Sequence, residues 1–312
     1  MVVDDIDAFF RKQGLRAELL TAAAAFRRQY NEQGVRKISK PHFPYFGRQI
    51  VEAALSALLT GANLLLVGPK AVGKNILAEN LAFLLGRPIW NVSFHIDVDA
   101  AYLIGMDTFR DGAVCFRPGP VYECVTAGGI CILDEINMAR NEALAVLHSL
   151  LDHRRQMEVP GYDRLVLHPA ARFIGTMNYG YEGTRNLNEA LLSRFVVLHL
   201  PVPGEQELQE LLTYEFADLR KGVASTLSAL FLDIRKKYEA KEISGRALDL
   251  RGLLDAVRLV RQGLTAEQAL DMGLTGKCFD AQERALVKDL LALRIPPDWG
   301  REDFFAKLVM MS

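Results

Sequence analysis

Residues 68 to 75 contain two glycines and a lysine at a spacing that suits phosphate binding. They read G-P-K-A-V-G-K-N and directly follow the apolar run 64–67, L-L-L-V. Glycines let the backbone curl so that its N–H groups point at an anion, and Lys74 adds a positive charge for the β- and γ-phosphates. The helical pattern from Ile76 onward would present its positive N-terminal end to the same phosphates. The segment therefore predicts a site for a nucleoside triphosphate. Its candidate contacts are Gly68, Pro69, Lys70, Ala71, Val72, Gly73, Lys74, Asn75 and Ile76.

Asn75, directly after the lysine, departs from the usual pattern of such loops. Ser or Thr is common at this place because its hydroxyl contacts Mg²⁺. An amide oxygen can also bind a hard cation or one of its waters. Asn75 is therefore a candidate metal ligand, although a weaker one, and the alternative is that the site lacks this ligand.

A second candidate cluster is the carboxylate pair Asp134 and Glu135. The pair follows the apolar run 130–133, I-C-I-L, and lies sixty residues beyond Lys74. In proteins with a phosphate loop, an Asp at the end of such a strand holds Mg²⁺. A carboxylate beside it can deprotonate the water that attacks the γ-phosphate. We interpret Asp134 as a metal ligand and Glu135 as a general base.

Two further polar residues stand next to predicted strands. Asn178 follows the run 172–176, so in a parallel sheet its amide would lie at the carboxyl edge, where ligands bind and where it can reach the γ-phosphate or the water. Arg194 ends a short helical pattern and has no acidic partner at helical spacing, so it can serve a neighbouring subunit's γ-phosphate. The alternatives are a strand-end Asn in a turn and a surface arginine that favours a helix C-terminus.

The pattern of elements predicts an α/β fold that would bring these residues together. The apolar runs 64–67, 89–94, 130–133, 172–176 and 196–200 are typical of strands in a parallel sheet covered on both faces. Residues 105–121 are expected to form a hairpin or a loop inserted in the core, and a second hairpin is expected within 157–167. After the segment 201–204, P-V-P-G, the pattern predicts helices only.

We therefore expect a P-loop core with a five-stranded parallel sheet, followed by an all-α lid domain. The expected domains are an N-terminal helical segment at 1–43, a nucleotide-binding α/β domain at 44–203 and the helical lid at 204–312.

Composition excludes several classes of protein. With 312 residues, half of them hydrophobic, and a net charge of −1, the chain lacks the basic balance of a nucleic-acid binder. Its four cysteines show no metal spacing. The N-terminus lacks the apolar core of a signal peptide and no apolar run approaches membrane-spanning length, so we expect a cytoplasmic protein with no membrane partner.

These motifs, in this order, resemble those of the AAA+ ATPases, and among them the MoxR-like branch, over about residues 44–290. Phe46 and Gly47 resemble the short segment near the adenine, and residues 104–120 resemble an insertion in the second helix of this family. The D-E-I-N sequence at 134–137 is similar to the extended Walker B motif, and Asn178 to the sensor 1 position.

The same resemblance implies roles for two arginines. The segment around Arg194 resembles the one that carries the arginine finger. Ser244-Gly245-Arg246 is similar to the S-P-R of sensor 2, with Gly245 in place of Pro, which makes Arg246 a further candidate catalytic residue.

The resemblance implies an ATPase with ATP and Mg²⁺ as cofactors, working as a homo-oligomeric ring, generally a hexamer, on protein clients. It implies that the clients are remodelled, matured or assembled, often beside a separate partner with a von Willebrand A domain. Two other functions stay open. One is a motor on nucleic acid, which the neutral charge disfavours. The other is a nucleotide-gated scaffold with little hydrolysis, for which Asn75 is the support.

Overall fold

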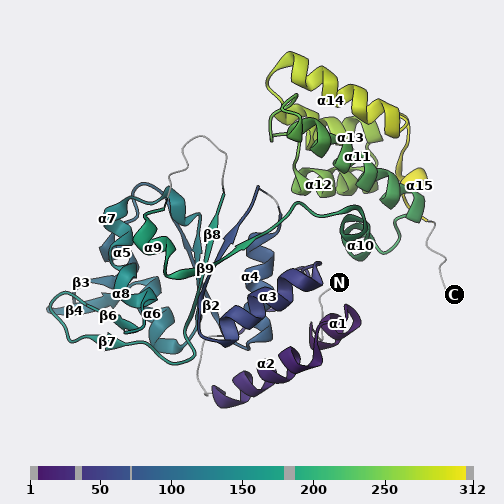
Figure 1. Ribbon diagram of the computed structural model, residues 1–312. Helices are drawn as coiled ribbons and strands as arrows, with labels where there is room; N and C mark the ends of the chain where they lie inside the picture. The colour runs from purple at the N-terminus through teal and green to yellow at the C-terminus, as the bar shows by residue number, and fades with distance from the viewer. Residues whose placement is uncertain (1–5, 32–36, 71, 179–186, 307–312) are drawn as a thin grey trace. The chain divides into compact units, whose positions relative to one another are not determined.

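The computed structural model describes residues 6–31, 37–70, 72–178 and 187–306 (Figure 1). The chain forms two compact units. One, the α/β unit, consists of Val2–Pro69 and Gly73–Pro201, and the other, the helical unit, mainly of Val202–Ser312. Within the described ranges, no helix is both long enough and apolar enough to span a membrane.

The α/β unit is built on a sheet of five parallel strands in the order β2-β5-β8-β1-β9. The predicted strands are confirmed, each end within one residue of its expected position. The strands are β1 (Asn63–Val67), β2 (Ile89–Ser93), β5 (Ile130–Asp134), β8 (Arg172–Met177) and β9 (Phe195–His199). All five residues of β1 are buried, which explains why its sequence is a continuous apolar run rather than an alternating one.

Helices lie on both sides of this sheet, as Figure 1 shows for α3 and α4 on one side and α6 and α8 on the other. The α/β unit contains α1 (Ile6–Lys12), α2 (Ala17–Gln29), α3 (Arg48–Leu59), α4 (Lys74–Leu84), α5 (Ala100–Ile104), α6 (Pro120–Ala127), η1 (Ile136–Met138), α7 (Asn141–Leu144), α8 (Leu147–Leu151) and α9 (Glu189–Leu192). The two longest helices after α2, α3 and α4, bury apolar residues at helical spacing against the strands.

Both predicted hairpins are confirmed, and they contact each other. The first pairs β3 (Gly105–Arg110) with β4 (Ala113–Pro118), and the second pairs β6 (Gln156–Met157) with β7 (Leu165–Val166). The hydroxyl of Tyr162 donates to the Asp107 carboxylate at 2.6 Å. The ring of Tyr162 also lies 5.0 Å, centroid to centroid, from that of Phe116. The hairpins are therefore joined across 55 residues of sequence.

Between Val202 and Ala306, every element of three or more residues that the structure describes is a helix. The amphipathic pattern of this region predicts that outcome, because each helix buries one apolar stripe in a common core. The elements are α10 (Glu205–Glu215), α11 (Lys221–Glu239), α12 (Leu250–Arg261), α13 (Ala266–Gly273), η2 (Thr275–Lys277), α14 (Ala281–Arg294) and α15 (Arg301–Phe304).

Close packing of α12 on α13 generates a prediction about stability. A Cβ atom at Gly252 would lie 2.1 Å from the Gly273 carbonyl oxygen, so Gly252→Ala must push the two backbones apart. We expect it to lower the free energy of unfolding by about 1–3 kcal/mol, the usual range for overpacking. The matched control is Gly222→Ala in α11, where a Cβ meets nothing within 4 Å. This control should stabilise the protein by about 0.4–1 kcal/mol. Urea unfolding of both variants measures the difference, and equal stabilities would contradict it.

Candidate functional site

The predicted phosphate loop connects the end of β1 to the start of α4. Its first residue, Gly68, donates its N–H to the Met177 carbonyl at 3.2 Å, which ties the loop to the end of β8. Its last glycine, Gly73, has a φ of 84°, a left-handed conformation that favours glycine. A Cβ there would also come 3.2 Å from the Tyr45 ring. Lys70 is exposed and Val72 buried, whereas Ala71 lies outside the described residues.

Lys74 extends back under this loop and is 8% exposed. Its ammonium donates to the carbonyl oxygens of Gly68 at 2.9 Å and Pro69 at 2.7 Å. A third bond, at 2.7 Å, goes to the Oδ1 atom of Asn178. The positive charge is therefore held at the carboxyl edge of β1 and β8, beside the loop that is predicted to receive phosphate.

Asp134 and Asn75, the two predicted metal ligands, are in contact. The Asn75 amide donates to one oxygen of the Asp134 carboxylate at 3.1 Å. The other oxygen of Asp134 accepts the hydroxyl hydrogen of Thr176. Asn75 thus supplies a hydrogen bond that a Ser or Thr hydroxyl at the same place could also supply, and its own Oδ1 atom is the group that can face a cation.

This donor set fits Mg²⁺ bound together with a nucleotide. The described part of the chain has no group of three or more His, Cys, Asp or Glu side chains that could hold a metal on its own. Mg²⁺ does not require such a group, because it is usually bound by one or two carboxylates together with substrate phosphates and waters. One carboxylate and one amide beside a phosphate loop are sufficient.

Glu135 has an uncommon backbone conformation, with a φ of 53°. Its N–H donates to the Thr176 hydroxyl oxygen at 3.0 Å, and its carboxylate accepts from the Asn178 amide at 2.8 Å. Non-glycine residues at positive φ are strained by about 1–3 kcal/mol and concentrate at functional sites. Thr176 holds this conformation in place while it also binds Asp134, so one hydroxyl fixes both acidic residues.

Asn178 connects the two halves of the site. Its Oδ1 atom accepts from Lys74, and its Nδ2 atom donates to Glu135. The resulting chain, Lys74–Asn178–Glu135, joins three residues that lie far apart in the sequence. The structure therefore brings together the predicted phosphate lysine, general base and strand-end amide.

The segment expected near the adenine is anchored to α4 by Asn80, a residue that the sequence analysis did not identify. The Asn80 side chain accepts from the Tyr45 N–H at 3.2 Å. It donates to the carbonyl oxygens of Phe43 at 2.8 Å and Ile76 at 2.7 Å. Phe46 and Gly47 follow directly, and Gly47, with a φ of 126°, is the N-cap residue before α3. Asn80 and Thr176 were missed because each acts through contacts that are distant in sequence.

Arg194 lies at the amino ends of the strands, opposite to the end of the sheet that carries the phosphate loop. It precedes Phe195, which pairs with Asn63, the first residue of β1, whereas the phosphate loop follows the last residue of β1. The five residues of β1 span about 16 Å, more than an arginine side chain can bridge. Arg194 donates instead to the carbonyl oxygens of His148 at 3.2 Å and of Ala190. Burial and the charge of Arg194 lower the pKa of His148.

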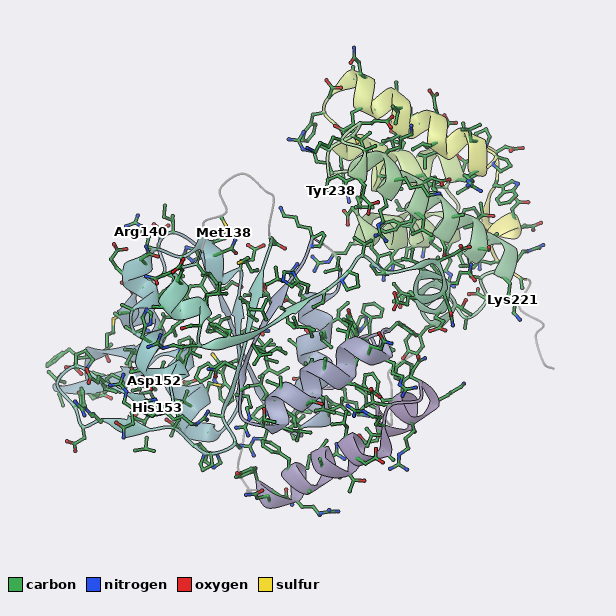
Figure 2. The ribbon with its side chains drawn as sticks, viewed as in Figure 1. Met138, Arg140, Asp152, His153, Lys221 and Tyr238 are labelled. Carbon is green, nitrogen blue, oxygen red and sulfur yellow. The ribbon has the colours of Figure 1, made fainter. Side chains whose placement is uncertain are left out.

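A pocket of about 290 Å³ lies beside Arg194 and includes Asp152 and His153. Figure 2 shows these two residues well away from Met138 and Arg140, which follow the carboxyl end of β5. Arg194 therefore does not contribute to the phosphate loop of its own chain.

Arg246 belongs to the helical unit and lies in the loop before α12. The helix begins at Leu250, after the Asp249 cap, so the substituted S-G-R motif lies outside it. The Arg246 guanidinium lies 5.2 Å from the centre of the exposed Phe279 ring.

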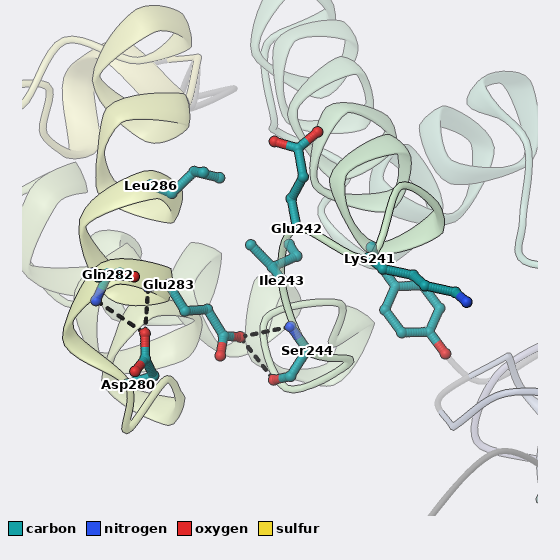
Figure 3. Close-up of a pocket in the computed structure, with 9 residues that line it drawn as sticks. Lys241, Glu242, Ile243, Ser244, Asp280, Gln282, Glu283 and Leu286 are labelled. Atoms are coloured by element: carbon teal, nitrogen blue, oxygen red, sulfur yellow. Dashed lines mark hydrogen bonds between the residues drawn. The ribbon is translucent and has the colours of Figure 1, made fainter.

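A pocket of about 510 Å³ adjoins this loop, and its polar groups serve the local fold. Glu283 accepts from the N–H and hydroxyl of Ser244, and Asp280 caps α14 (Figure 3).

The double role of Thr176 generates a prediction. Thr176→Val keeps the shape of the side chain but leaves the half-buried Glu135 N–H without its acceptor and the Asp134 carboxylate without its donor. We expect the free energy of unfolding to fall by about 1–3 kcal/mol, the usual penalty for an unsatisfied buried group. Thr126→Val, on the exposed face of α6, is the control and should change stability by less than about 0.5 kcal/mol. Chemical denaturation compares them, and a Thr176→Val protein as stable as the control would refute this role.

Comparisons with known proteins agree with this geometry. A family described as AAA domain (dynein-related subfamily) matches residues 63–195. Uncharacterized protein YojN of Bacillus subtilis (strain 168) is 32% identical over 243 residues, 76% of this chain and 79% of YojN. Uncharacterized protein SH1500 of Staphylococcus haemolyticus (strain JCSC1435) is 30% identical over 237 residues, 74% of this chain and 90% of SH1500.

Among solved structures, a point mutant of RuvB from Thermotoga maritima aligns with a TM-score of 0.46 and 18% identity, covering 80% of this chain and 71% of the RuvB chain. The relatives and the matched domain, together with a P-loop on a five-stranded parallel sheet, lead to one conclusion: the chain belongs to the AAA+ ATPase family, with an AAA domain of the dynein-related subfamily.

Proposed function

We propose that this protein is a MoxR-like AAA+ ATPase, which hydrolyses ATP in a homo-oligomeric ring, a hexamer, and uses the energy to remodel, mature or assemble client proteins. The observation that carries hydrolysis is the hydrogen-bonded chain Lys74–Asn178–Glu135. A protein that only binds nucleotide has no need for a carboxylate held beside the phosphate lysine by a shared amide. The proposed domain limits are 1–43, 44–203 and 204–312.

In the proposed reaction each residue of the site has one task. The backbone N–H groups of residues 70–76 and the Lys74 ammonium bind the phosphates, and Phe46 and Gly47 lie beside the base. Asp134 and Asn75 would hold Mg²⁺, which supplies positive charge to the β- and γ-phosphate oxygens. Glu135 takes a proton from water as the water oxygen bonds to the γ-phosphorus and the bond to ADP breaks. Asn178 holds the Glu135 carboxylate and the Lys74 ammonium in fixed positions relative to each other.

Arg194 would complete the site of a neighbouring subunit. Its position at the amino edge of the sheet supports action in trans, since it cannot reach the phosphate loop of its own chain. A ring of head-to-tail subunits meets this requirement at every interface. Arg246 of the helical unit is the proposed sensor 2 residue, on the strength of the S-G-R motif.

The MoxR-like assignment is supported by the D-E-I-N sequence and by the β3–β4 hairpin between α5 and α6. With this assignment we also propose protein clients, a separate partner with a von Willebrand A domain, and a cytoplasmic location. Nucleic acid is not a proposed partner, because the net charge of −1 offers no excess of cations for phosphate contacts.

Replacing the proposed base tests hydrolysis directly. Glu135→Gln keeps the size of the side chain and can still contact Asn178, but it cannot take up a proton. We expect steady-state ATP turnover to fall by about 10²–10⁴, the range of a general-base effect, with nucleotide affinity retained. The control is Glu142→Gln on the exposed start of α7, which should turn over like the wild type. A Glu135→Gln protein that keeps more than half of the wild-type rate would exclude Glu135 as the base.

Mixing two inactive variants tests whether Arg194 acts between subunits. Arg194→Ala lacks the finger and Lys74→Ala lacks the phosphate lysine, so each should be inactive alone. In mixed rings some interfaces pair an intact loop with an intact Arg194, and part of the activity should return. An arginine finger is worth roughly 10³–10⁵ in turnover in GTPases, so recovery should stand far above background.

The control for this mixture is Arg154→Ala, because the Arg154 guanidinium is held by Asp152 near the same edge of the sheet. It should be active alone. If mixed rings form, as shown by native mass spectrometry, and remain as inactive as their components, Arg194 does not act in trans.

A further inference from the structure

Two asparagines of the α/β unit, Asn80 and Asn137, are almost fully buried, and they differ in how their polar atoms are satisfied. Asn80 is 0% exposed, and both its oxygen and its nitrogen are hydrogen-bonded. Asn137 is 2% exposed, and its Oδ1 atom has no hydrogen-bond partner among the residues that the structure describes. A buried acceptor without a donor is rare and is destabilising, so its presence requires an explanation.

Asn137 lies inside the network of the site. It is part of η1, the short turn that directly follows Glu135. Its Nδ2 atom donates to the Asn178 backbone carbonyl at 3.0 Å. The side chain of Asn178 in turn contacts both Lys74 and Glu135. Asn137 is thus hydrogen-bonded directly to Asn178, the residue that contacts both Lys74 and Glu135.

The neighbours of Asn137 indicate what kind of group its free oxygen can bind. The hydrogen bonds around it involve the carbonyl oxygen of Asn178 and, through Asn178, the carboxylate of Glu135. Both are acceptors and cannot serve Oδ1, which as an amide oxygen is itself an acceptor, so its missing partner must be a donor. Water is the smallest such donor, and it has two O–H groups, enough to serve two acceptors at once.

We propose that Asn137 is a positioning residue for ATP hydrolysis. Its Nδ2 atom fixes the Asn178 backbone, and its Oδ1 atom accepts a hydrogen bond from a water molecule once nucleotide is bound. This water molecule donates one O–H to the Oδ1 atom of Asn137. The attacking water gives a proton to Glu135 as the water oxygen bonds to the γ-phosphorus and the bond to ADP breaks. The inference rests on the proposed function, because it assigns a role within the same reaction.

Replacing each buried asparagine by leucine, which has a similar size, separates this role from a purely structural one. Asn137→Leu removes an unsatisfied acceptor but also the donor to the Asn178 carbonyl, so its melting temperature should fall by less than that of Asn80→Leu. Its affinity for a fluorescent ATP analogue should be unchanged, because the Asn137 side chain donates to Asn178 rather than to the phosphate loop. Its turnover should fall about 10²-fold, as expected when a reacting group is displaced.

Asn80→Leu is the matched control and should lose more stability, together with nucleotide affinity. It leaves the Tyr45 N–H and two carbonyl oxygens without partners, so its melting temperature and its affinity for the analogue should both fall. Asn137→Ala serves as a second variant if leucine does not fit, and it should show the same loss of turnover with unchanged affinity.

The outcomes separate the inference from the function on which it rests. Wild-type turnover that collapses in Glu135→Gln establishes hydrolysis first. If both Asn137 variants then turn over like the wild type, or lose turnover only in proportion to a loss of folded protein, Asn137 is structural and the inference is wrong. If the wild type itself does not hydrolyse ATP, the proposed function fails, and the inference that rests on it fails with it.

Discussion

The parallel pairing of β5, β8 and β1 is the constraint on which the site depends. In a parallel sheet all strands end at one edge, so the residues that follow neighbouring strands meet there whatever their distance in sequence. Leu133 of β5 pairs with Gly175 of β8, and Val67 of β1 pairs with Met177. Asp134, Thr176 and the phosphate loop therefore arrive at the same place, and their side chains need only short hydrogen bonds to form a site.

At the amino ends of the strands, arginine side chains have a different role from that of Lys74. Arg87, Arg172 and Arg194 each precede or begin a strand, and each donates to backbone carbonyl oxygens. Several of these carbonyls belong to the last turn of a helix, for example Leu58 of α3 and Ala127 of α6, where oxygens lack intrahelical partners. Burial lowers the pKa of Arg172 to about 10, because desolvation disfavours the charged form. Arginines at the amino ends of the strands thus donate to carbonyl oxygens at helix ends. Arg194 makes such contacts too, at the end of the sheet opposite to its own nucleotide loop.

One residue with a strained backbone conformation lies where the chemistry is proposed. Glu135 is one of four described non-glycine residues with positive φ, and its conformation turns the chain from β5 directly into η1. That turn places the Glu135 carboxylate against Asn178 and brings Asn137 under the end of β8. The hydroxyl of Thr176 binds the Glu135 N–H and offsets part of the strain. A strained residue held by its neighbours is pre-organised, which suits a group that must meet a reacting atom.

The sequence by itself determined the strands, both hairpins, the helical region after residue 201 and the phosphate loop. It could do so because each depends on a local pattern: a short apolar run, a turn sequence or an amphipathic stripe. Only the tertiary structure decided how the polar residues are used. Asn75 donates to Asp134, Asn178 joins Lys74 to Glu135, and Asn80 anchors the segment before α3. These bonds join residues 35 to 104 positions apart, and a hydrogen bond between two strand ends leaves no periodic trace in the sequence.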